Sequence, residues 1–503
     1  MTEPIRKIID RLGGPVVSIA INALIVIVLI NVVVFQTLET GREIEVQVLE
    51  AEEPPELEQE LEKLDELPPD ENLMQVEEPE TLPDSPPDSF ANDSMDLAGL
   101  AVSAVDSPLV MKGLFAGRTE AARTDRLNRF AGGYGEQVEA TVMRGLEWLA
   151  SRQDDAGYWG EVSRYNKTWH ERDWSASLEN EQRAARLTSL CLLAFLAHGD
   201  TPQSPMFGTN VRRAIEYLRD QQEPEAGLFV PMSGKKPEKG GEDLGVYAHA
   251  QATYALAEAY ALTRAPALKK TVEHGLQVII DGQLDSGAWG NWYVQDISDS
   301  SATSWQIQAM KAAAAAGIRM DGLDAAMKKA VEGVTFLYKG EGEWYYRKGP
   351  PIKTWSSGGP IMSGAMVLSL QLLGLQNDPM VLAGLRYMND FGVTEWDEAW
   401  GNPINKSLPA TYEWYYNTQA VFQRGGSRWT TWNADFAPML INRQHPEGWW
   451  RGPEQAAGGE TIYSTSLCTL ALQVYYRILP TFQQVKEEAP KVTFDDDVVI
   501  TIL

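Results

Sequence analysis

The stretch RGLEWLASRQDDAGYW, residues 144–159, contains the unit that decides the fold. A helical run ends near Gln153, and a short turn leads to Gly157 and the aromatic residue Trp159. The same order of helical run, turn and closing aromatic recurs along the chain, with Gln missing from some copies. The closing aromatics stand 50 to 70 residues apart, at Trp159, Phe229, Trp289, Trp344, Trp400 and Trp450, with Trp396 beside Trp400 in a degenerate fifth copy. Recurrence at such a period indicates a repeat architecture.

A second and more apolar run follows each turn. A helix that is apolar around its whole circumference is buried, whereas the first runs keep a charged face and belong outside. The sequence therefore predicts an all-α fold, a closed α/α toroid of six helical hairpins over residues 131–482. The segment TSLC occurs in the first and sixth inner runs, at 188–191 and 465–468, which predicts that these helices are neighbours. The inner runs are residues 183–198, 246–262, 301–316, 360–373, 412–423 and 461–476.

The turn Gln-x(3–5)-Gly-x-Trp resembles the QW repeat of squalene-hopene and oxidosqualene cyclases, which share an α/α toroid with prenyltransferases. The stretches YAHAQATYALAEAY at 247–260 and WYYNTQAVFQ at 414–423 also resemble a group of membrane-anchored bacterial prenyltransferase/squalene-oxidase repeat proteins. The resemblance implies that Gln ties one helix end to the start of the next helix while Trp covers the junction.

The N-terminus contains an apolar run, residues 16–35, preceded by Arg6, Lys7 and Arg11. About 20 apolar residues are enough to cross a bilayer as a helix, and the basic flank stays in the cytoplasm. A secretory signal is the alternative, but the run is too long and no cleavage pattern follows it. The sequence predicts a cytoplasmic tail (1–15) and a single span (16–36) in a bacterial inner membrane. The bulk of the chain would then be periplasmic or otherwise extracytoplasmic.

Residues 37–130 are predicted to be a disordered acidic linker that passes into a transitional segment. The part from 39 to 96 holds 21 acidic and two basic residues, and so most of the net charge of −27. High charge with little apolar surface favours an extended spacer. Residues 483–503 form a C-terminal tail. The rest of the chain has no basic footprint, which argues against nucleic acid as a partner.

Ser18 and Asn22 share one face of the predicted span, where they can contact neighbouring transmembrane helices. The layout of basic tail, span and proline-rich stalk resembles TonB-type energy-transducing proteins. Those carry Ser and His at this spacing, and Asn22 replaces the His. Coupling of this kind is therefore one expectation, and simple helix packing is the other.

A squalene-type cyclase needs a strong acid to protonate an alkene. The Asp-x-Asp-Asp motif of hopene cyclases is absent from the inner runs, but the segment ISDSS at 297–301 resembles the VSDCT stretch of oxidosqualene cyclases. The resemblance implies Asp299 as the acid and Asp296 as its partner, hence a reduced terpene cyclase. The alternative is that Asp299 caps the following helix, accepting hydrogen bonds from backbone N–H groups.

Aromatic and imidazole side chains near the starts of the inner runs predict a binding cavity. An apolar, isoprenoid-like ligand suits such a lining, and ordinary core packing is the competing interpretation. The main hypothesis is thus an envelope-anchored binding or scaffold module rather than an enzyme. The candidate ligand-binding residues are Tyr247, His249, Trp305, Tyr412 and Tyr415.

A polysaccharide-active toroid is the third hypothesis, because paired carboxylates cleave glycosidic bonds. Its candidate acids are Glu171 with Asp173, and Asp397 with Glu398. No metal site and no cofactor are predicted, since the chain has five histidines and two cysteines. Cys191 and Cys468 lie in apolar runs and are expected to remain thiols.

Overall fold

A computed structural model describes residues 120–160, 178–230, 245–291, 297–350, 358–396, 410–451 and 459–476, with short segments at 492–493 and 499–500. All of these belong to one compact unit, Phe90–Leu503. The predicted anchor with Ser18 and Asn22, the linker before residue 120, Asp296 and the four loop acids lie outside the described residues. Within the described ranges, no helix is both long and apolar enough to cross a membrane.

Six helices in the described ranges form an inner layer. Almost every residue of α8, α10 and α12 is buried, so the prediction that helices apolar all round lie inside is confirmed. The observed bounds agree with the predicted inner runs to within a few residues at most ends. The inner helices are α6 (Leu178–His198), α8 (Gly245–Thr263), α10 (Ser300–Ala315), α12 (Gly359–Leu372), α15 (Ala410–Arg424) and α17 (Gly459–Leu472), which η5 (Gln473–Tyr476) continues.

The outer helices bury one face only. In α7, for example, Val211, Ile215 and Leu218 are buried, while Arg212 and Glu216 form a half-exposed pair one turn apart. Each outer helix packs against the inner helix of the preceding hairpin, such as α7 against α6 and α9 against α8. The outer helices are α5 (Gly135–Ser151), α7 (Gly208–Gln221), α9 (Pro266–Asp281), α11 (Leu323–Leu337), α13 (Pro379–Phe391) and α16 (Gly426–Arg443).

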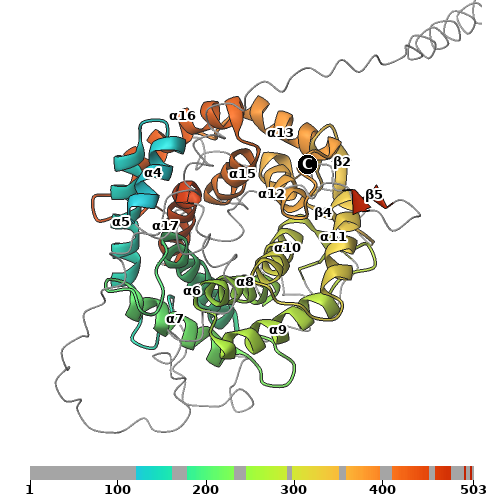
Figure 1. The fold of residues 1–503 in the computed structure, drawn as a ribbon, viewed down its shortest axis with the longest axis horizontal. Helices are drawn as coiled ribbons and strands as arrows, with labels where there is room; N and C mark the ends of the chain where they lie inside the picture. The colour runs from blue at the N-terminus through green and yellow to red at the C-terminus, as the bar shows by residue number, and fades with distance from the viewer. Residues whose placement is uncertain are drawn as a thin grey trace, which may run out of the picture. The chain divides into compact units, whose positions relative to one another are not determined.

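The inner helices follow one another around a ring. In chain order each packs against the next, from α6 through α8, α10, α12 and α15 to α17, and α17 packs against α6 (Figure 1). The predicted helical, toroid-type architecture is confirmed. The two helices that carry TSLC are neighbours as expected, and both Cys191 and Cys468 are buried free thiols. Burial raises the pKa of both thiols well above the ordinary value.

The repeated glutamine joins successive hairpins. In four junctions its side-chain amide donates to the carbonyl of the turn glycine and to a carbonyl in the first turns of the next outer helix. This is the tie that the QW resemblance implies. The pairs are Gln153 with Gly157 and Asn210, Gln222 with Gly227 and Thr271, Gln283 with Gly287 and Ala326, and Gln444 with Gly448 and Thr141, all at 2.8–3.1 Å.

In four of the junctions a closing tryptophan covers the junction from inside. Its indole N–H donates to a carbonyl ten residues earlier, near the end of the outer helix, so the apolar ring is buried without an unpaired donor. The bonds run from Trp159 to Leu149 (2.7 Å), Trp289 to Ile279 (2.8 Å), Trp344 to Val334 (3.0 Å) and Trp450 to Leu440 (2.9 Å).

The fourth and fifth junctions depart from this pattern. After α11 the chain forms short strands, β2 (Tyr338–Gly340), β3 (Glu343–Trp344) and β4 (Arg347–Lys348), and β4 pairs with β1 (Ser298–Asp299). A further pair joins β5 (Val492–Thr493) and β6 (Val499–Ile500). In the fifth junction Trp396 stacks on Trp414 of α15, with ring centroids 5.3 Å apart. The strand pairs β1–β4, β2–β3 and β5–β6 were not part of the all-helical prediction.

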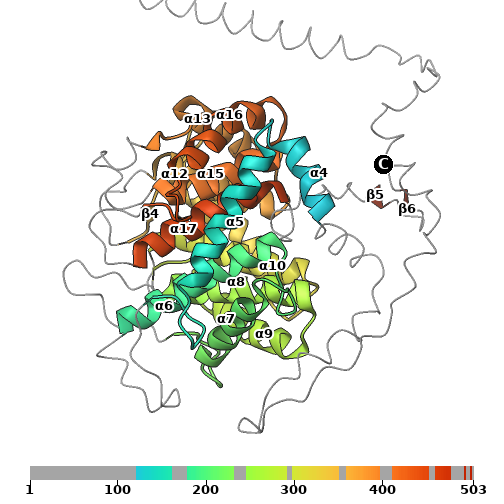
Figure 2. The ribbon, with the colours of Figure 1, turned by 90° about the vertical axis from the view of Figure 1, so that its left-hand side faces the viewer.

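Helix α4 (Glu120–Phe130) lies against α5 and η5 (Figure 2). The carboxylate of Glu139 in α5 forms an ion pair with Nε of Arg123 in α4 at 3.4 Å. It also accepts a hydrogen bond from the hydroxyl of Tyr476 at 2.5 Å. His198, at the end of α6, places Nδ1 2.6 Å from Asp200 and Nε2 3.9 Å from Glu139. Burial disfavours a charged imidazole, but the hydrogen bond to Asp200 and the nearby carboxylate of Glu139 outweigh it and raise the pKa of His198.

We expect this cluster to make stability depend on pH. The pKa of His198 is higher in the folded than in the unfolded protein, so protonated His198 stabilises the fold. This stabilisation is complete below the unfolded pKa of 6.5. The contribution is lost as pH rises through the folded value. Tm should therefore fall by a few degrees between about pH 6 and about pH 9. His198→Gln should remove this fall, and an unchanged pH profile in the variant would contradict the assignment.

Candidate functional site

Asp299 ends β1 and forms the N-cap of α10. Its Oδ1 accepts from the backbone N–H of Ala302 at 3.0 Å and from the hydroxyl of Ser301 at 2.6 Å. The expectation that Asp299 caps its own helix is confirmed. The carboxylate is also fully buried.

Arg347 is the partner of Asp299 that the sequence did not indicate. The β1–β4 ladder sets Arg347 opposite Asp299, and its Nε lies 2.8 Å from Oδ2. The Asp299 side chain is 1% exposed and that of Arg347 is 34% exposed, so the pair stands at the edge of the buried region. Burial opposes the charge on Arg347, but the neighbouring carboxylate prevails and raises the pKa of the guanidinium.

Two further groups complete the surroundings of Asp299. The hydroxyl of Tyr247, in the first turn of α8, lies 2.7 Å from the Ser301 oxygen and 3.4 Å from Oδ1 of Asp299. The amide of Asn291 donates to Oδ2 of Asp299 and to the Tyr247 hydroxyl, both at 3.0 Å, while its oxygen accepts from Arg347. Burial and the charge of Asp299 raise the pKa of Tyr247 well above its ordinary value, so the phenol stays protonated.

The arrangement makes Asp299 an acceptor. Donors from Ala302, Ser301, Arg347 and Asn291 face its two oxygens, so a proton on either oxygen would meet another donor. An acid that protonates an alkene needs the opposite, namely a neutral carboxyl group that is free to release its proton. This geometry suits a structural cap and ion pair.

An aromatic cluster lies beyond this network. Trp305 of α10 stacks on Tyr415 of α15, with ring centroids 5.6 Å apart and planes 18° apart. Tyr412 and Tyr416 meet Trp305 edge to face at 6.3 and 5.6 Å, and Tyr254 of α8 lies 6.4 Å away. All five rings are almost completely buried. Residues 412, 415 and 416 share one face of α15, since they stand three and four positions apart.

Polar bonds hold the tyrosines in place. The Tyr416 hydroxyl accepts from Ser304 at 3.0 Å and from Gln308 at 2.8 Å, and Tyr415 donates to the oxygen of Gln308 at 3.0 Å. Burial raises the pKa of Tyr415 and Tyr416 above that of a free phenol. The cluster therefore combines protonated hydroxyls with closely packed aromatic rings.

Arg186 of α6 adds a positive charge that sequence reasoning missed. Its guanidinium lies 4.7 Å from the ring centroid of Tyr463 on α17 and 5.8 Å from that of Tyr247 on α8. Such cation–π contacts stabilise a guanidinium over an aromatic face. No local pattern marks Arg186, because its partners come from two other inner helices.

His249 does not join the other four predicted ligand-binding residues. Its Nδ1 accepts from the backbone N–H of Phe229 at 3.4 Å, and Nε2 lies 2.9 Å from the carbonyl of Gly275. In three other hairpins a threonine hydroxyl accepts from the closing tryptophan in the same way: Thr188, Thr303 and Thr465. Burial lowers the pKa of His249 to about 4, so the neutral ring is a structural part of the second junction. Trp305, Tyr412 and Tyr415 do come together, and Tyr247 lies beside Ser301, one turn before Trp305.

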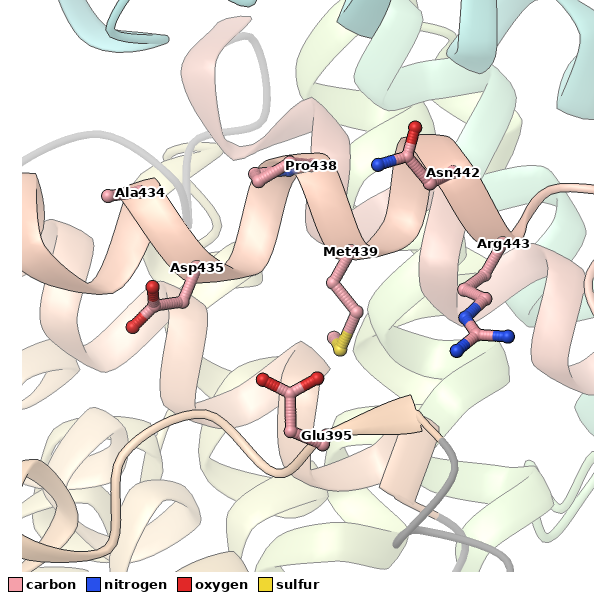
Figure 3. A pocket seen from close by; sticks show the side chains of 7 residues that line it. All are labelled: Glu395, Ala434, Asp435, Pro438, Met439, Asn442 and Arg443. Atoms are coloured by element: carbon pink, nitrogen blue, oxygen red, sulfur yellow. The ribbon is translucent and has the colours of Figure 1, made fainter.

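A separate pocket of about 490 Å³ lies on the outer helix α16, where Met439 points towards Glu395 (Figure 3). Asp435 and Glu395 line one part and Arg443 another. None of the residues predicted for ligand binding or catalysis lines it. It is an exposed surface feature, outside the interior cluster.

Comparisons with known proteins give distant similarities. No protein-family model and no curated protein matches the chain. It is similar to the type II terpene cyclase MstE from Scytonema, with a TM-score of 0.43 and 12% identity, covering 68% of this chain and 100% of that chain. It is also similar to the α-1,6-mannanase GH76A from Salegentibacter sp. HEL1_6, with a TM-score of 0.48 and 10% identity over 67% of this chain and 99% of that chain. A D-mannose isomerase matches with a TM-score of 0.45 and 12% identity, over 67% and 96% of the two chains.

The three similar proteins have different activities. At these identities and scores the similarities carry no argument about what this chain binds or catalyses. The ring arrangement of the helices is established by the contacts between the helices of this chain.

Proposed function

We propose that the chain is an envelope-anchored binding or scaffold module, a closed ring of six helical hairpins whose interior takes an apolar, isoprenoid-like ligand. The observation that carries this proposal is the convergence of Trp305, Tyr412 and Tyr415 on the inner side of α10 and α15. Aromatic faces are typical linings of sites for apolar ligands. The anchor is proposed from the sequence, on the basic residues before an apolar run long enough to span the inner membrane.

A reduced terpene cyclase is the alternative, and the surroundings of Asp299 argue against it. An aspartate that already accepts a helix N–H, a serine hydroxyl and a guanidinium is poorly suited to release a proton. Polysaccharide cleavage stays a third hypothesis, since its four candidate acids lie outside the described residues. A TonB-like coupling through Ser18 and Asn22 is likewise a proposal drawn from the sequence.

The binding proposal is tested by recovering the ligand. Full-length protein is purified from the membranes that produce it, and bound lipid is extracted and identified by mass spectrometry. We expect an isoprenoid-like lipid in amounts approaching one per chain. Trp305→Leu should reduce the recovery about tenfold, because it removes the central aromatic face.

The matched control is Phe336→Leu, an exposed aromatic on the outer helix α11 that should leave recovery unchanged. Equal recovery from Trp305→Leu and the native protein would contradict the site. Absence of any lipid from the native protein would contradict the function. Incubation with squalene should give no cyclised product.

A further inference from the structure

Gln251 lies on the same side of α8 as the residues that face the ring interior. Tyr247, Gln251 and Tyr254 stand four and three positions apart, which places them on one face of the helix. Tyr247 contacts Ser301 of α10, and Tyr254 contacts Trp305. Tyr247 and Ser301 contact each other in the first turns of α8 and α10, two helices that pack side by side. Gln251 and Trp305 each stand four residues further along, so we infer that they lie at the same level of the ring.

These two side chains hold buried polar atoms that no described residue satisfies. Both atoms of the Gln251 amide and the indole nitrogen of Trp305 have no hydrogen-bond partner among the described residues. Gln251 and Trp305 are fully buried. Buried polar groups are almost always paired in folded proteins, so these three atoms favour a polar group of a ligand beside them. The hydroxyl of Tyr412, which meets Trp305 edge to face, also has no partner among the described residues.

The identities of the three atoms select the kind of group. The Trp305 N–H and the Gln251 N–H donate, and the Gln251 oxygen accepts. A hydroxyl group can accept both donors through its two lone pairs and donate its own hydrogen to the oxygen. An ether or carbonyl would leave the Gln251 oxygen without a donor, and a hydrocarbon would leave all three atoms unpaired.

We propose that Gln251 and Trp305 recognise a hydroxyl group, so that the ligand of the ring interior is an isoprenoid-like alcohol. This inference rests on the proposed function, since it names the polar end of the same ligand. The aromatic faces of Trp305, Tyr412 and Tyr415 then contact the apolar part, and Gln251 sets the preference for an alcohol.

The test compares three probes that differ at one group. Full-length protein in detergent is titrated with geranylgeraniol, its methyl ether and the corresponding deoxygenated hydrocarbon, in competition with radiolabelled geranylgeraniol. We expect the native protein to bind the alcohol at least about tenfold more tightly than either analogue, because only the alcohol pairs all three atoms. Gln251→Leu, which keeps a similar volume, should bind the three probes with similar affinity. Trp305→Phe should weaken binding of the alcohol more than binding of the hydrocarbon.

Gln277→Leu on the exposed face of α9 is the matched control and should keep the native preference. Melting temperatures identify misfolding, and Gln251→Leu should melt no lower than the native protein because it removes an unpaired buried amide. Equal affinity of the native protein for the three probes would overturn the hydroxyl site and leave the binding function standing. Failure of all three probes to bind would overturn both.

Discussion

Gly448→Ala is expected to lower the free energy of unfolding by about 4 kcal/mol, as a sum of backbone strain and a steric clash. Gly448 has a φ of +102°, a conformation that side chains with a Cβ rarely adopt. An added Cβ would stand 2.1 Å from the carbonyl oxygen of Arg144 and 2.7 Å from its carbonyl carbon. These are backbone atoms of α5, so the turn and the helix must separate.

This separation would also break the junction between the last and first hairpins. The Gln444 amide bridges the Gly448 carbonyl and the Thr141 carbonyl at 2.9 and 2.8 Å, and both bonds depend on the close approach. Chemical denaturation of the purified protein measures the loss. Gly392→Ala is the matched control, because Gly392 has a φ of +70° and no atom within 4 Å of the added Cβ.

Gly392→Ala should therefore cost about 2 kcal/mol, the strain alone, since its φ of 70° and ψ of −165° are adopted almost only by glycine. If Gly448→Ala lowers the free energy of unfolding no more than this control does, the turn that contains Gly448 does not pack on α5 as described. A cost as large as the one expected would show that closure between α16 and α5 contributes to stability.

Asp299→Ala is expected to lower the free energy of unfolding by about 3 kcal/mol. The substitution removes the N-cap of α10 and leaves Ser301, Arg347 and Asn291 facing a methyl group. Asp299→Asn should cost about 1 kcal/mol, because asparagine caps a helix nearly as well but carries no charge for Arg347. From the cap alone one would expect asparagine to keep almost all of the stability, and the ion pair with Arg347 changes that expectation.

The contribution of the pair is measured with a double-mutant cycle of Asp299→Asn and Arg347→Gln, which isolates their interaction. A coupling energy near zero would contradict the ion pair. The same variants separate binder from enzyme. Product formed from squalene by the native protein, and lost in Asp299→Asn at unchanged melting temperature, would favour the terpene cyclase.

Much of the candidate site follows from helix periodicity. Residues three and four positions apart on one helix must share a face, so the inward direction of Tyr412, Tyr415 and Trp305 is predictable from their runs. His249 shows the limit of that reasoning. It lies in the same helix start as Tyr247, but it takes the junction position that threonine occupies in other hairpins, and only the three-dimensional arrangement shows this.

The sequence by itself determined the helices, their division into inner and outer layers, and the junctions of Gln, Gly and Trp. These depend on bonds over short distances, such as the ten residues between each closing tryptophan and its acceptor, and on local apolar periodicity. Only the tertiary structure decided the partners of Asp299, the place of Arg186 between Tyr247 and Tyr463, and the level of Gln251 with Trp305. Those contacts join residues that are far apart in the chain, and their geometry depends on how neighbouring helices and the β1–β4 ladder align. Hydrophobic burial brings the helices together but does not specify that alignment, because the attraction between apolar surfaces has no direction.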